Sequence, residues 1–484
     1  MSGKEYIIGI DAGTSGIKAL AFSYKGDLIR SEKWQLEVLP SDHGWMEHDA
    51  ELIFRSTLSC ITDLIEAMGY VPLAIGFCTF MHSIMAVDKQ VRPLGNLQLW
   101  NDNRSASSAS LLKNTETGND IYWHTGAPIH PMSPLTKIRQ MSVSDPESFK
   151  NAAWFIGIKE YLLYKFTGKL IIDYSTASAT GLFDSRNKVW YAPALDWCGI
   201  KASLLADPVS SRQTFPCILD QMKDIIIVPG LSDGAAANLG AGNIDPAECT
   251  LTLGTSAAVR FTGPEKTTDP EGVLFSYCID EANFISGGAS NNCFNVIEKV
   301  VSALGLDKEC LFDPEFMSDA ADNLLYLPWM FGERAPVQLL EPLSGFIDLP
   351  ASCRPVQQVK SAVTCILFNL KHIVEKLSRL NDGNFECIHL SGGLSHIKPI
   401  RLLTSSIFNI PLAEHITGES SALGTAIYTA CAAGIVSDYK DIQQWNPITA
   451  IHEADPVLAD KFGFLYQRFR EISREYIWKE GKRS

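Results

Sequence analysis

The fold of this chain is decided by residues 6–22, which read YIIGIDAGTSGIKALAF. The apolar run at 6–10 predicts a buried strand, and the apolar run at 19–22 predicts its antiparallel hairpin partner. Lys25-Gly26-Asp27 then provides the next turn. The two strands enclose a turn of small residues, which is the kind of turn that can lie against a ligand.

The groups in this turn suit a phosphate. Gly13 and Gly16 let the backbone approach a ligand closely, while Thr14 and Ser15 offer hydroxyl groups and N–H donors. Lys18 supplies a cation. A glycine-rich hairpin that binds nothing explains this segment equally well when it is taken alone.

A carboxylate beside this turn, and a second copy of the turn, favour the phosphate-binding interpretation over a hairpin that binds no ligand. Asp11, at the end of the first strand, can hold Mg²⁺, and such a carboxylate beside a phosphate-binding turn is the equipment of nucleotide phosphoryl transfer. Residues 249–261 read CTLTLGTSAAVRF, with the same Gly-Thr-Ser turn and Thr252 in place of the carboxylate. The repetition indicates two related halves that hold one phosphate chain, and a chance match is the weaker explanation.

A series of motifs follows the two turns along the chain. The motifs are MHS at 81–83, WNDNRS at 100–105, TGAPIHPMSPLTKI at 125–138, IGIKEY at 156–161, DYSTASATG at 173–181, GLSDGAAANLG at 230–240, FGERAP at 331–336 and ESSALG at 419–424. Their order is similar to the actin/hexokinase/Hsp70 superfamily and, within it, to the FGGY carbohydrate kinases. The resemblance extends over nearly the whole chain, and its details resemble the gluconate kinase branch more than the xylulose or glycerol branches.

This resemblance implies an α/β fold with two actin-like (ribonuclease H-like) domains, each a mixed sheet flanked by helices, and an active site in the cleft between them. We expect an N-terminal domain at 1–240 for sugar, metal and catalytic base, a nucleotide-binding domain at 241–445, and a helical tail at 446–484 that packs back toward the first domain. The predicted strands are 6–10, 19–22, 74–78, 225–228, 249–253, 257–261, 324–327 and 387–390, and the predicted helices are 49–68, 104–114, 158–166, 355–378 and 456–482.

Asp233 is the candidate catalytic base. It follows an apolar strand and precedes the small residues 234–237, so a role as a helix N-cap is the alternative for an isolated aspartate. The resemblance implies that it contacts the sugar and takes the proton from its hydroxyl group. Phosphoryl transfer needs an oriented nucleophile with a late proton acceptor, and a helix N-terminus nearby stabilises phosphate charge.

Five residues of the first half are candidate sugar contacts. The resemblance implies that His82 lies at the sugar, although a lone histidine after a strand is more often structural. Trp100 and Asp102 offer an aromatic face and a carboxylate, which suit a polyol, and Trp100 could equally belong to the core. Arg104 and Lys159 are candidate ligands of a sugar-acid carboxylate; a solvated helix-start residue and a local ion pair are the alternatives.

The candidate nucleotide contacts come from both halves. A Gly-Gly pair alone is usually only a turn, and the resemblance is what assigns these pairs to the nucleotide. The chain departs from the family pattern close to these positions, at Cys293-Phe294 and at 394–397. The predicted ATP-binding residues are Thr14, Ser15, Lys18, Gly254, Thr255, Gly288, Asn292, Gly392 and Gly393.

Composition excludes several classes of protein. The 484 residues suggest two domains or more, and 46% hydrophobic and 20% charged residues are typical of a globular protein. A formal charge of −14 argues against a nucleic-acid or anionic-membrane surface, and it requires a local cationic pocket for an anionic substrate. The twelve cysteines include no Cys-x-x-Cys pair, which favours reduced cytosolic thiols over a disulfide framework or a zinc site. Neither a secretory leader nor a membrane span is expected.

We therefore expect a cytoplasmic enzyme that transfers the γ-phosphate of ATP, with Mg²⁺, to a primary hydroxyl of a sugar acid, with D-gluconate first. A xylulose or other polyol kinase is the alternative enzyme, and a non-catalytic sugar-sensing paralogue is the alternative of another class. Asp11 and Asp233, and the expected lack of a DNA-binding segment before Tyr6, favour the enzyme. An Hsp70-like chaperone would need a peptide-binding domain that we do not expect here. A homodimer is left open.

Overall fold

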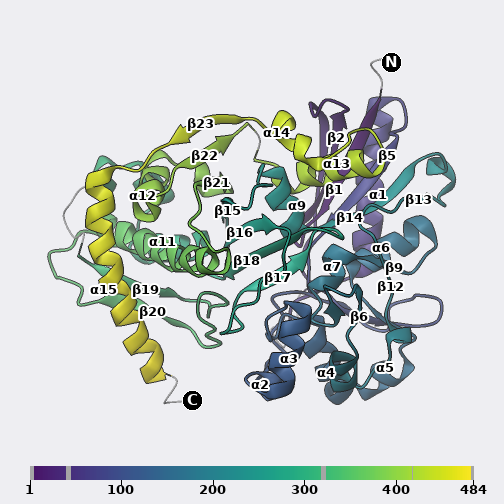
Figure 1. Cartoon of the computed structure of the whole chain (residues 1–484), viewed down its shortest axis with the longest axis horizontal. Helices are drawn as coiled ribbons and strands as arrows, with labels where there is room; N and C mark the ends of the chain where they lie inside the picture. Colours follow the sequence, from purple (N-terminus) through teal and green to yellow (C-terminus); the bar gives the residue numbers. More distant parts are fainter. Residues whose placement is uncertain (1–4, 40–44, 318–322, 417, 481–484) are drawn as a thin grey trace. The chain divides into compact units, whose positions relative to one another are not determined.

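The computed structural model describes residues 5–39, 45–317, 323–416 and 418–480. The chain divides into two compact units, each of which combines segments from distant parts of the sequence (Figure 1). The first unit contains Met1–Ile244, Thr262–Ser286 and Glu419–Pro447, and the second contains Asp245–Phe261, Gly287–Gly418 and Ile448–Ser484.

A six-stranded sheet organises the first unit, in the order β13-β14-β5-β1-β2-β3. β1 pairs antiparallel with β2, as the hairpin pattern predicts, and parallel with β5, which is in turn parallel to β14. The strands are β1 (Tyr6–Ala12), β2 (Gly16–Ser23), β3 (Leu28–Gln35), β5 (Ala74–Thr79), β13 (Phe215–Pro216) and β14 (Ile226–Ser232).

Both faces of this sheet are buried, which explains the nearly continuous apolar sequence of β1. Ile8 and Ile10 pack in one core cluster with α1 (Ala50–Met68), and Ile7 packs on the other face in a cluster with α13 (Ser420–Ala432). The alternation follows from the two-residue period of a strand. The helix predicted at 49–68 and the strands predicted at 6–10, 19–22, 74–78 and 225–228 are confirmed.

Small residues let α13 lie close to the sheet and to α9 (Asp233–Gly240). A Cβ atom added at Gly76 of β5 would lie 1.8 Å from Thr429 Oγ1 of α13. A Cβ atom added at Gly424 of α13 would lie 2.0 Å from the carbonyl oxygen of Ala236 of α9. The glycines and alanines of the GLSDGAAANLG and ESSALG motifs therefore hold α9, and with it Asp233, against the sheet.

Shorter elements complete the first unit. The helices are α2 (Ala106–Leu112), α3 (Glu116–Thr125), α4 (Pro134–Ser144), α5 (Pro146–Asn151), α6 (Ile158–Thr167), α7 (Tyr174–Ser178), α8 (Ala192–Cys198) and α14 (Ile442–Trp445). The remaining strands form two-stranded pairs: β4 (Glu47–His48) with β7 (Leu97–Gln98), β6 (Met85–Val87) with β8 (Trp154–Ile156), β9 (Ile171–Asp173) with β12 (Asp207–Val209), and β10 (Phe183–Asp184) with β11 (Val189–Trp190). β17 (Phe275–Cys278) pairs with β18 (Phe284–Ser290), and these two strands are the edge of a seven-stranded sheet.

The second unit repeats the hairpin-plus-parallel-strand arrangement of the first. β15 pairs antiparallel with β16, as the Gly-Thr-Ser pattern predicts, and parallel with β21. The elements of this unit are β15 (Glu248–Leu253), β16 (Ala257–Gly263), β19 (Leu325–Trp329), β20 (Leu343–Ile347), β21 (Cys387–Ser391), β22 (Leu412–His415), β23 (Ile448–His452), α10 (Phe294–Ala303), α11 (Pro355–Leu380), α12 (Lys398–Phe408) and α15 (Pro456–Glu480).

The C-terminal helix differs from its predicted packing. The tail is predicted to pack back toward the first domain, whereas α15 belongs to the second unit and packs against α11 and α12. Phe368 of α11 lies 5.5 Å from the ring of Tyr466 and 5.6 Å from that of Phe469, both on α15. These aromatic contacts bury the apolar face of α15. The helical periodicity of the sequence predicts this apolar face, but it does not predict which element covers it.

Candidate active site

Three parallel strands bring the predicted catalytic carboxylates to one edge of the first sheet. Asp11 lies opposite Cys78 in the register of β1 and β5, and Ser232 lies opposite Thr79 in the register of β14 and β5. Asp233 follows Ser232 directly and is the first residue of α9. Because the carboxyl ends of neighbouring parallel strands share an edge, this topology collects Asp11 and Asp233 in one place.

The environment of Asp11 is rich in negative charge. Burial raises the pKa of Asp11 to about 6; Lys18 acts against this shift, and the carboxylates of Asp233 and Glu419 add to it. The Cys78 thiol lies 3.9 Å from Asp11 Oδ1. Three carboxylates that repel one another, with hard oxygen donors, form a group that a divalent cation would stabilise.

Lys18 is engaged by one of these carboxylates. Lys18 Nζ and Lys33 Nζ each lie 2.7 Å from an oxygen of Glu419, at the start of α13. The Lys18 side chain keeps 39% of its surface exposed. The predicted phosphate contact is therefore a lysine that is paired with an acidic residue and open to solvent.

The turn between β1 and β2 is fixed by backbone hydrogen bonds. Gly13 N donates to the carbonyl oxygen of Gly16 at 2.9 Å. The carbonyl oxygen of Thr14 lies 2.7 Å from His48 Nε2, which must be the donor because a carbonyl oxygen only accepts. Ser15 is exposed. The predicted ATP contacts Thr14 and Ser15 thus lie on a rigid turn whose outer side chain faces solvent.

A bulge in β14 precedes Asp233. The pairing of β14 with β5 shifts between Val228 and Leu231. Gly230 has φ of 77°, and a Cβ atom there would lie 2.2 Å from the carbonyl oxygen of Phe77. Only glycine fits this conformation and this approach. The bulge therefore sets the direction in which the strand delivers Asp233.

Lys159 holds this bulge, which corrects its predicted role as a ligand of a substrate carboxylate. Its Nζ donates to the carbonyl oxygens of Phe77 at 2.5 Å, Pro229 at 2.7 Å and Leu231 at 2.9 Å. The side chains of Lys159 and Asp173 are fully buried, with Nζ 3.6 Å from Asp173 Oδ2. Three carbonyl acceptors satisfy the three N–H groups of the ammonium group, and the buried Asp173 carboxylate balances its charge. Lys159 is therefore a structural cation.

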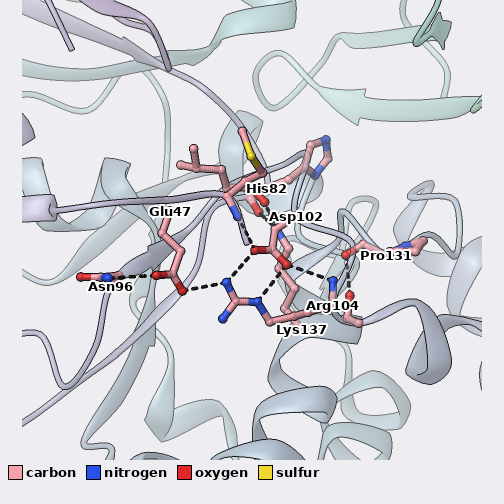
Figure 2. Close-up of polar contacts among 10 residues, drawn as sticks. Glu47, His82, Asn96, Asp102, Arg104, Pro131 and Lys137 are labelled. Atoms are coloured by element: carbon pink, nitrogen blue, oxygen red, sulfur yellow. Dashed lines mark hydrogen bonds and ion pairs between the residues drawn. The ribbon is translucent and has the colours of Figure 1, made fainter. Parts of the chain in front are cut away.

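The side chains of Asp102 and Arg104 form an ion-pair network with Glu47 (Figure 2). Arg104 Nε and NH2 donate to the two oxygens of Asp102 at 2.9 and 2.6 Å, and NH2 also lies 2.7 Å from Glu47 Oε1. Asn96 Nδ2 donates to Glu47 Oε2 at 2.9 Å. The Arg104 guanidinium lies over the ring of Trp45, 4.0 Å from its centroid.

This network fixes Asp102 in its ionised form. Burial alone would raise the pKa of Asp102, but hydrogen bonds from Arg104 and from Met46 N outweigh burial and hold the pKa below its usual range. Two carboxylates and one guanidinium leave the group with a formal charge of −1. The two partners of Arg104 therefore compete with any carboxylate of a substrate for its guanidinium.

His82 and Trp100 flank this network. His82 Nδ1 lies 2.9 Å from the carbonyl oxygen of Ala179 and must donate to it, so Nε2 is the acceptor nitrogen of the neutral ring. Trp100 is half-buried in a turn closed by Asp102 N and the carbonyl oxygen of Leu99, 3.1 Å apart. The ring centroid of His82 lies 6.1 Å from that of Tyr277, and an acceptor nitrogen near an aromatic side chain is compatible with a polyol ligand.

The nucleotide candidates of the second unit surround the matching turn. Gly254 N donates to the carbonyl oxygen of Ser256 at 3.0 Å, and the N–H groups of Phe294 and Asn295 donate to Gly254 and Thr255 at 3.1 and 3.2 Å. Backbone hydrogen bonds from the start of α10 therefore fix this turn, as a backbone hydrogen bond also fixes the turn between β1 and β2.

A cavity of about 510 Å³ opens beside this turn. This volume is typical of small-molecule sites. The predicted residues Gly254, Thr255 and Gly393 line it, as do the two segments that depart from the family pattern. Gly392 has φ of 92°, which only glycine adopts easily, and it directly precedes the lining residue Gly393. The lining residues are Leu253, Gly254, Thr255, Phe294, Lys308, Glu309, Leu311, Phe312, Gly393, Leu394 and Ile397.

The remaining nucleotide candidates lie next to a buried carboxylate. Gly288 is a buried residue of β18. Asn292 Nδ2 donates to Gly332 O at 2.6 Å, and Asn292 Oδ1 accepts from Phe331 N at 3.0 Å. These bonds engage both ends of the buried amide, and a direct ATP contact of this side chain stays a prediction. Burial raises the pKa of the neighbouring Glu333 to about 7.

Sequence reasoning missed several residues that organise the site. Glu47 has no motif signal, because its partner Arg104 is distant in sequence. Lys137 lies inside the quoted 125–138 motif and is a buried lysine that donates to the carbonyl oxygens of His82, at 2.9 Å, and Leu99. A lysine among the apolar positions of a helix is the signal that could have marked it.

Two strand–turn–strand units, with Asp11 and Asp233 at one edge of a sheet, are compatible with a phosphotransferase. Comparison with known proteins identifies the family. The chain matches the N-terminal domain of the FGGY family of carbohydrate kinases over residues 6–240 and the C-terminal domain over 249–433. It belongs to the FGGY family of carbohydrate kinases. The predicted family, two-domain fold and enzyme class are confirmed.

Individual relatives cover the chain almost completely. A gluconokinase of Bacillus licheniformis is 30% identical over 97% of this chain and 96% of its own length. The structures of a ligand-bound xylulose kinase and of a gluconate kinase, both from Lactobacillus acidophilus, are 28% identical and cover 99% of this chain and 100% of their own, with TM-scores of 0.95 and 0.94. Within the described part of the chain, no helix has the length and apolar character of a membrane span.

Proposed function

We propose that the enzyme transfers the γ-phosphate of ATP to a primary hydroxyl of D-gluconate, giving 6-phosphogluconate. The observation that carries the proposal is the pair of Asp233 and Asp11 at one strand edge, together with gluconokinase relatives that match along the full chain. Asp233 accepts the proton of the attacking hydroxyl, and the N-terminus of α9 faces the charge that develops on the transferred phosphoryl group.

The donor set around Asp11 supports Mg²⁺ as the metal. Its oxygen atoms are hard ligands. Burial, with a smaller contribution from the negative charge of Asp233 and Glu419, raises the pKa of Asp11 to about 6. When bound, Mg²⁺ neutralises phosphate charge and orients the β- and γ-phosphates. The protein residues themselves position the sugar hydroxyl, hold its proton and keep the strand edge in register.

The 510 Å³ cavity of the second unit supports ATP as the donor. Gly254, Thr255 and Gly393 provide backbone close to a phosphate or ribose, and Phe294, Leu311 and Leu394 provide apolar surface suited to a base. All twelve cysteines are free thiols, which supports the cytoplasmic location proposed from the sequence.

A pentulose such as xylulose is the second candidate acceptor. One observation favours it: Arg104 is already paired with Asp102 and Glu47, and this group carries a formal charge of −1. A neutral sugar avoids repulsion by these carboxylates. A coupled ATP-consumption assay over gluconate, xylulose, ribulose and glycerol tests both candidates. Gluconate turnover far above that of the neutral sugars supports the first, and xylulose turnover with inert gluconate overturns it.

A further inference from the structure

A second cluster of metal-ligand side chains lies in the sheet of the second unit, apart from the residues discussed above. Glu248 begins β15, and Cys387 and His389 lie on β21. Glu248 is the register partner of Cys387, and Thr250 is that of His389. Because side chains two residues apart share a face of a strand, Cys387 and His389 project to one side of the sheet.

The donor atoms of this cluster converge. One carboxylate oxygen of Glu248, Cys387 Sγ and one ring nitrogen of His389 all lie within 4.8 Å of one another. His389 Nε2 is 2.7 Å from Glu248 Oε2. In a tetrahedral zinc site with bonds of about 2.0–2.3 Å, neighbouring ligand atoms are about 3–4 Å apart. Small side-chain rotations are enough to reach that spacing.

A fourth residue supports the histidine from the next strand. His389 Nδ1 lies 2.7 Å from Nε2 of His415 at the end of β22, and the two rings stack with centroids 5.0 Å apart. A metal-bound histidine usually gives its other ring N–H to an outer acceptor, which fixes the ring. His415 stands in that position, while His389 itself is buried with 2% of its side chain exposed.

We propose that Glu248, Cys387 and His389 form a binding site for a borderline-soft divalent transition metal of the Zn²⁺ or Co²⁺ class, with His415 as its outer support. One thiolate, one imidazole and one carboxylate select such ions over Mg²⁺. On binding, the Cys387 S–H bond breaks, its proton passes to solvent and the sulfur binds the metal. His389 exchanges its Nε2 proton, which is donated to Glu248 in the metal-free structure, for a proton on Nδ1 through solvent, and the freed Nε2 binds the metal. Three protein ligands leave the fourth tetrahedral position for water.

This proposal departs from the expectation, based on cysteine spacing, of reduced thiols without a zinc site. The spacing rule searches for neighbouring ligands in sequence, whereas Glu248 and His389 come from strands 141 residues apart. The ion would join the first residues of β15 and β21, whose opposite ends lead to Gly254 and Gly393 at the cavity. At about 3.3 Å per strand residue, the metal and the cavity lie some 15 Å apart. The proposal is independent of the substrate assignment.

Cobalt titration of the chelator-stripped full-length chain, without ATP or sugar, tests the site. We expect one equivalent of Co²⁺ to produce a near-ultraviolet thiolate-to-cobalt band that Zn²⁺ removes and excess Mg²⁺ does not. Cys387→Ser should abolish the band, and His415→Leu should weaken Co²⁺ binding about 10–100-fold. Cys431→Ser and His452→Gln, at a half-buried cysteine and at a histidine paired with Glu414, are matched controls that should keep it.

Two outcomes would overturn the proposal: no thiolate band in the wild-type chain, or an undiminished band in folded Cys387→Ser. Glu248→Gln provides a second test if the serine variant fails to fold, because it keeps the shape of the side chain and removes the anionic ligand. A Glu248→Gln chain that binds Co²⁺ as tightly as wild type also contradicts the site.

Discussion

Lys159 Nζ donates a hydrogen bond of 2.7 Å to the carbonyl oxygen of Pro229, at the bulge that precedes Asp233, the proposed catalytic base. The same ammonium group binds the carbonyl oxygens of Phe77 and Leu231, so it bridges β5 and β14 at the point where their register shifts. A buried cation thus satisfies carbonyl groups that the bulge removes from the sheet ladder. Lys159 therefore supports the strand segment that leads to Asp233.

Lys159→Met should lower the free energy of unfolding by about 2–4 kcal/mol, because it leaves buried carbonyl groups unpaired and Asp173 without its countercharge. It should also lower kcat more than it raises KM. Denaturant unfolding and steady-state kinetics measure both effects. Lys165→Met is the control, since Lys165 pairs with Glu51 at the surface and should cost little. Wild-type stability and kcat in Lys159→Met would contradict the assigned role.

The local elements of this fold were predictable because their signals are local. The two hairpins follow from apolar runs around Gly13–Gly16 and Gly254–Ser256, and α11 follows from a helical pattern of apolar residues. The role of Lys159 was not predictable in this way. Its three acceptors lie on two strands, 70 to 82 residues away, and exist as unpaired carbonyl groups only because of the bulge.

The same distinction applies to the charged residues of the site. The sequence shows Arg104 two residues from Asp102, which suggests a neighbouring cation, but it does not show Glu47, 57 residues earlier, as the second partner. Whether a charged side chain binds a ligand or pairs with another side chain depends on the tertiary structure. The carboxylate at the end of β1 was recognisable because the strand and the turn that present it are both local.

Asp233→Asn should reduce kcat by about 10²–10⁴-fold while sugar binding changes little, because the amide keeps the shape of the side chain but cannot accept the hydroxyl proton. Turnover assays and calorimetric sugar titration separate the two effects. Asn238→Asp provides a control for a polar change elsewhere in α9, although its buried bonds to Asn243 and Thr262 make a stability check necessary. An Asp233→Asn enzyme within a few-fold of wild-type turnover would exclude Asp233 as the base.

Asp11 should make the stability of the metal-free protein depend on pH. The folded-state pKa is raised from 3.8 to about 6, so the folded state binds more protons between these values and its stability falls as pH rises through about 6. Asp11→Asn should remove this component and stabilise the metal-free chain at pH 8 by about 1–2 kcal/mol. Thermal unfolding between pH 5 and pH 8 measures the difference.

Mg²⁺ binding at Asp11 should depend on pH in the opposite direction, so that the cation stabilises the folded chain more at high pH than at low pH. Because only the ionised Asp11 binds the cation well, the rise in melting temperature caused by Mg²⁺ should be larger at pH 8 than at pH 5 in wild type. The rise should be absent in Asp11→Asn. An equal response to Mg²⁺ in the variant would remove Asp11 from the metal site.

Arg104→Met tests how the enzyme recognises its acceptor. Since Arg104 pairs with Asp102 and Glu47, its loss should release the loop that carries Asp102 and lower kcat/KM by about 10–100-fold for acidic and neutral acceptors alike. Arg92→Met is the matched control, because Arg92 forms a comparable pair with Asp88 on an exposed surface. A loss on gluconate at least tenfold greater than on a neutral sugar would instead mean that the guanidinium leaves its carboxylate partners and binds the substrate carboxylate directly, as its position beside Asp102 first suggests.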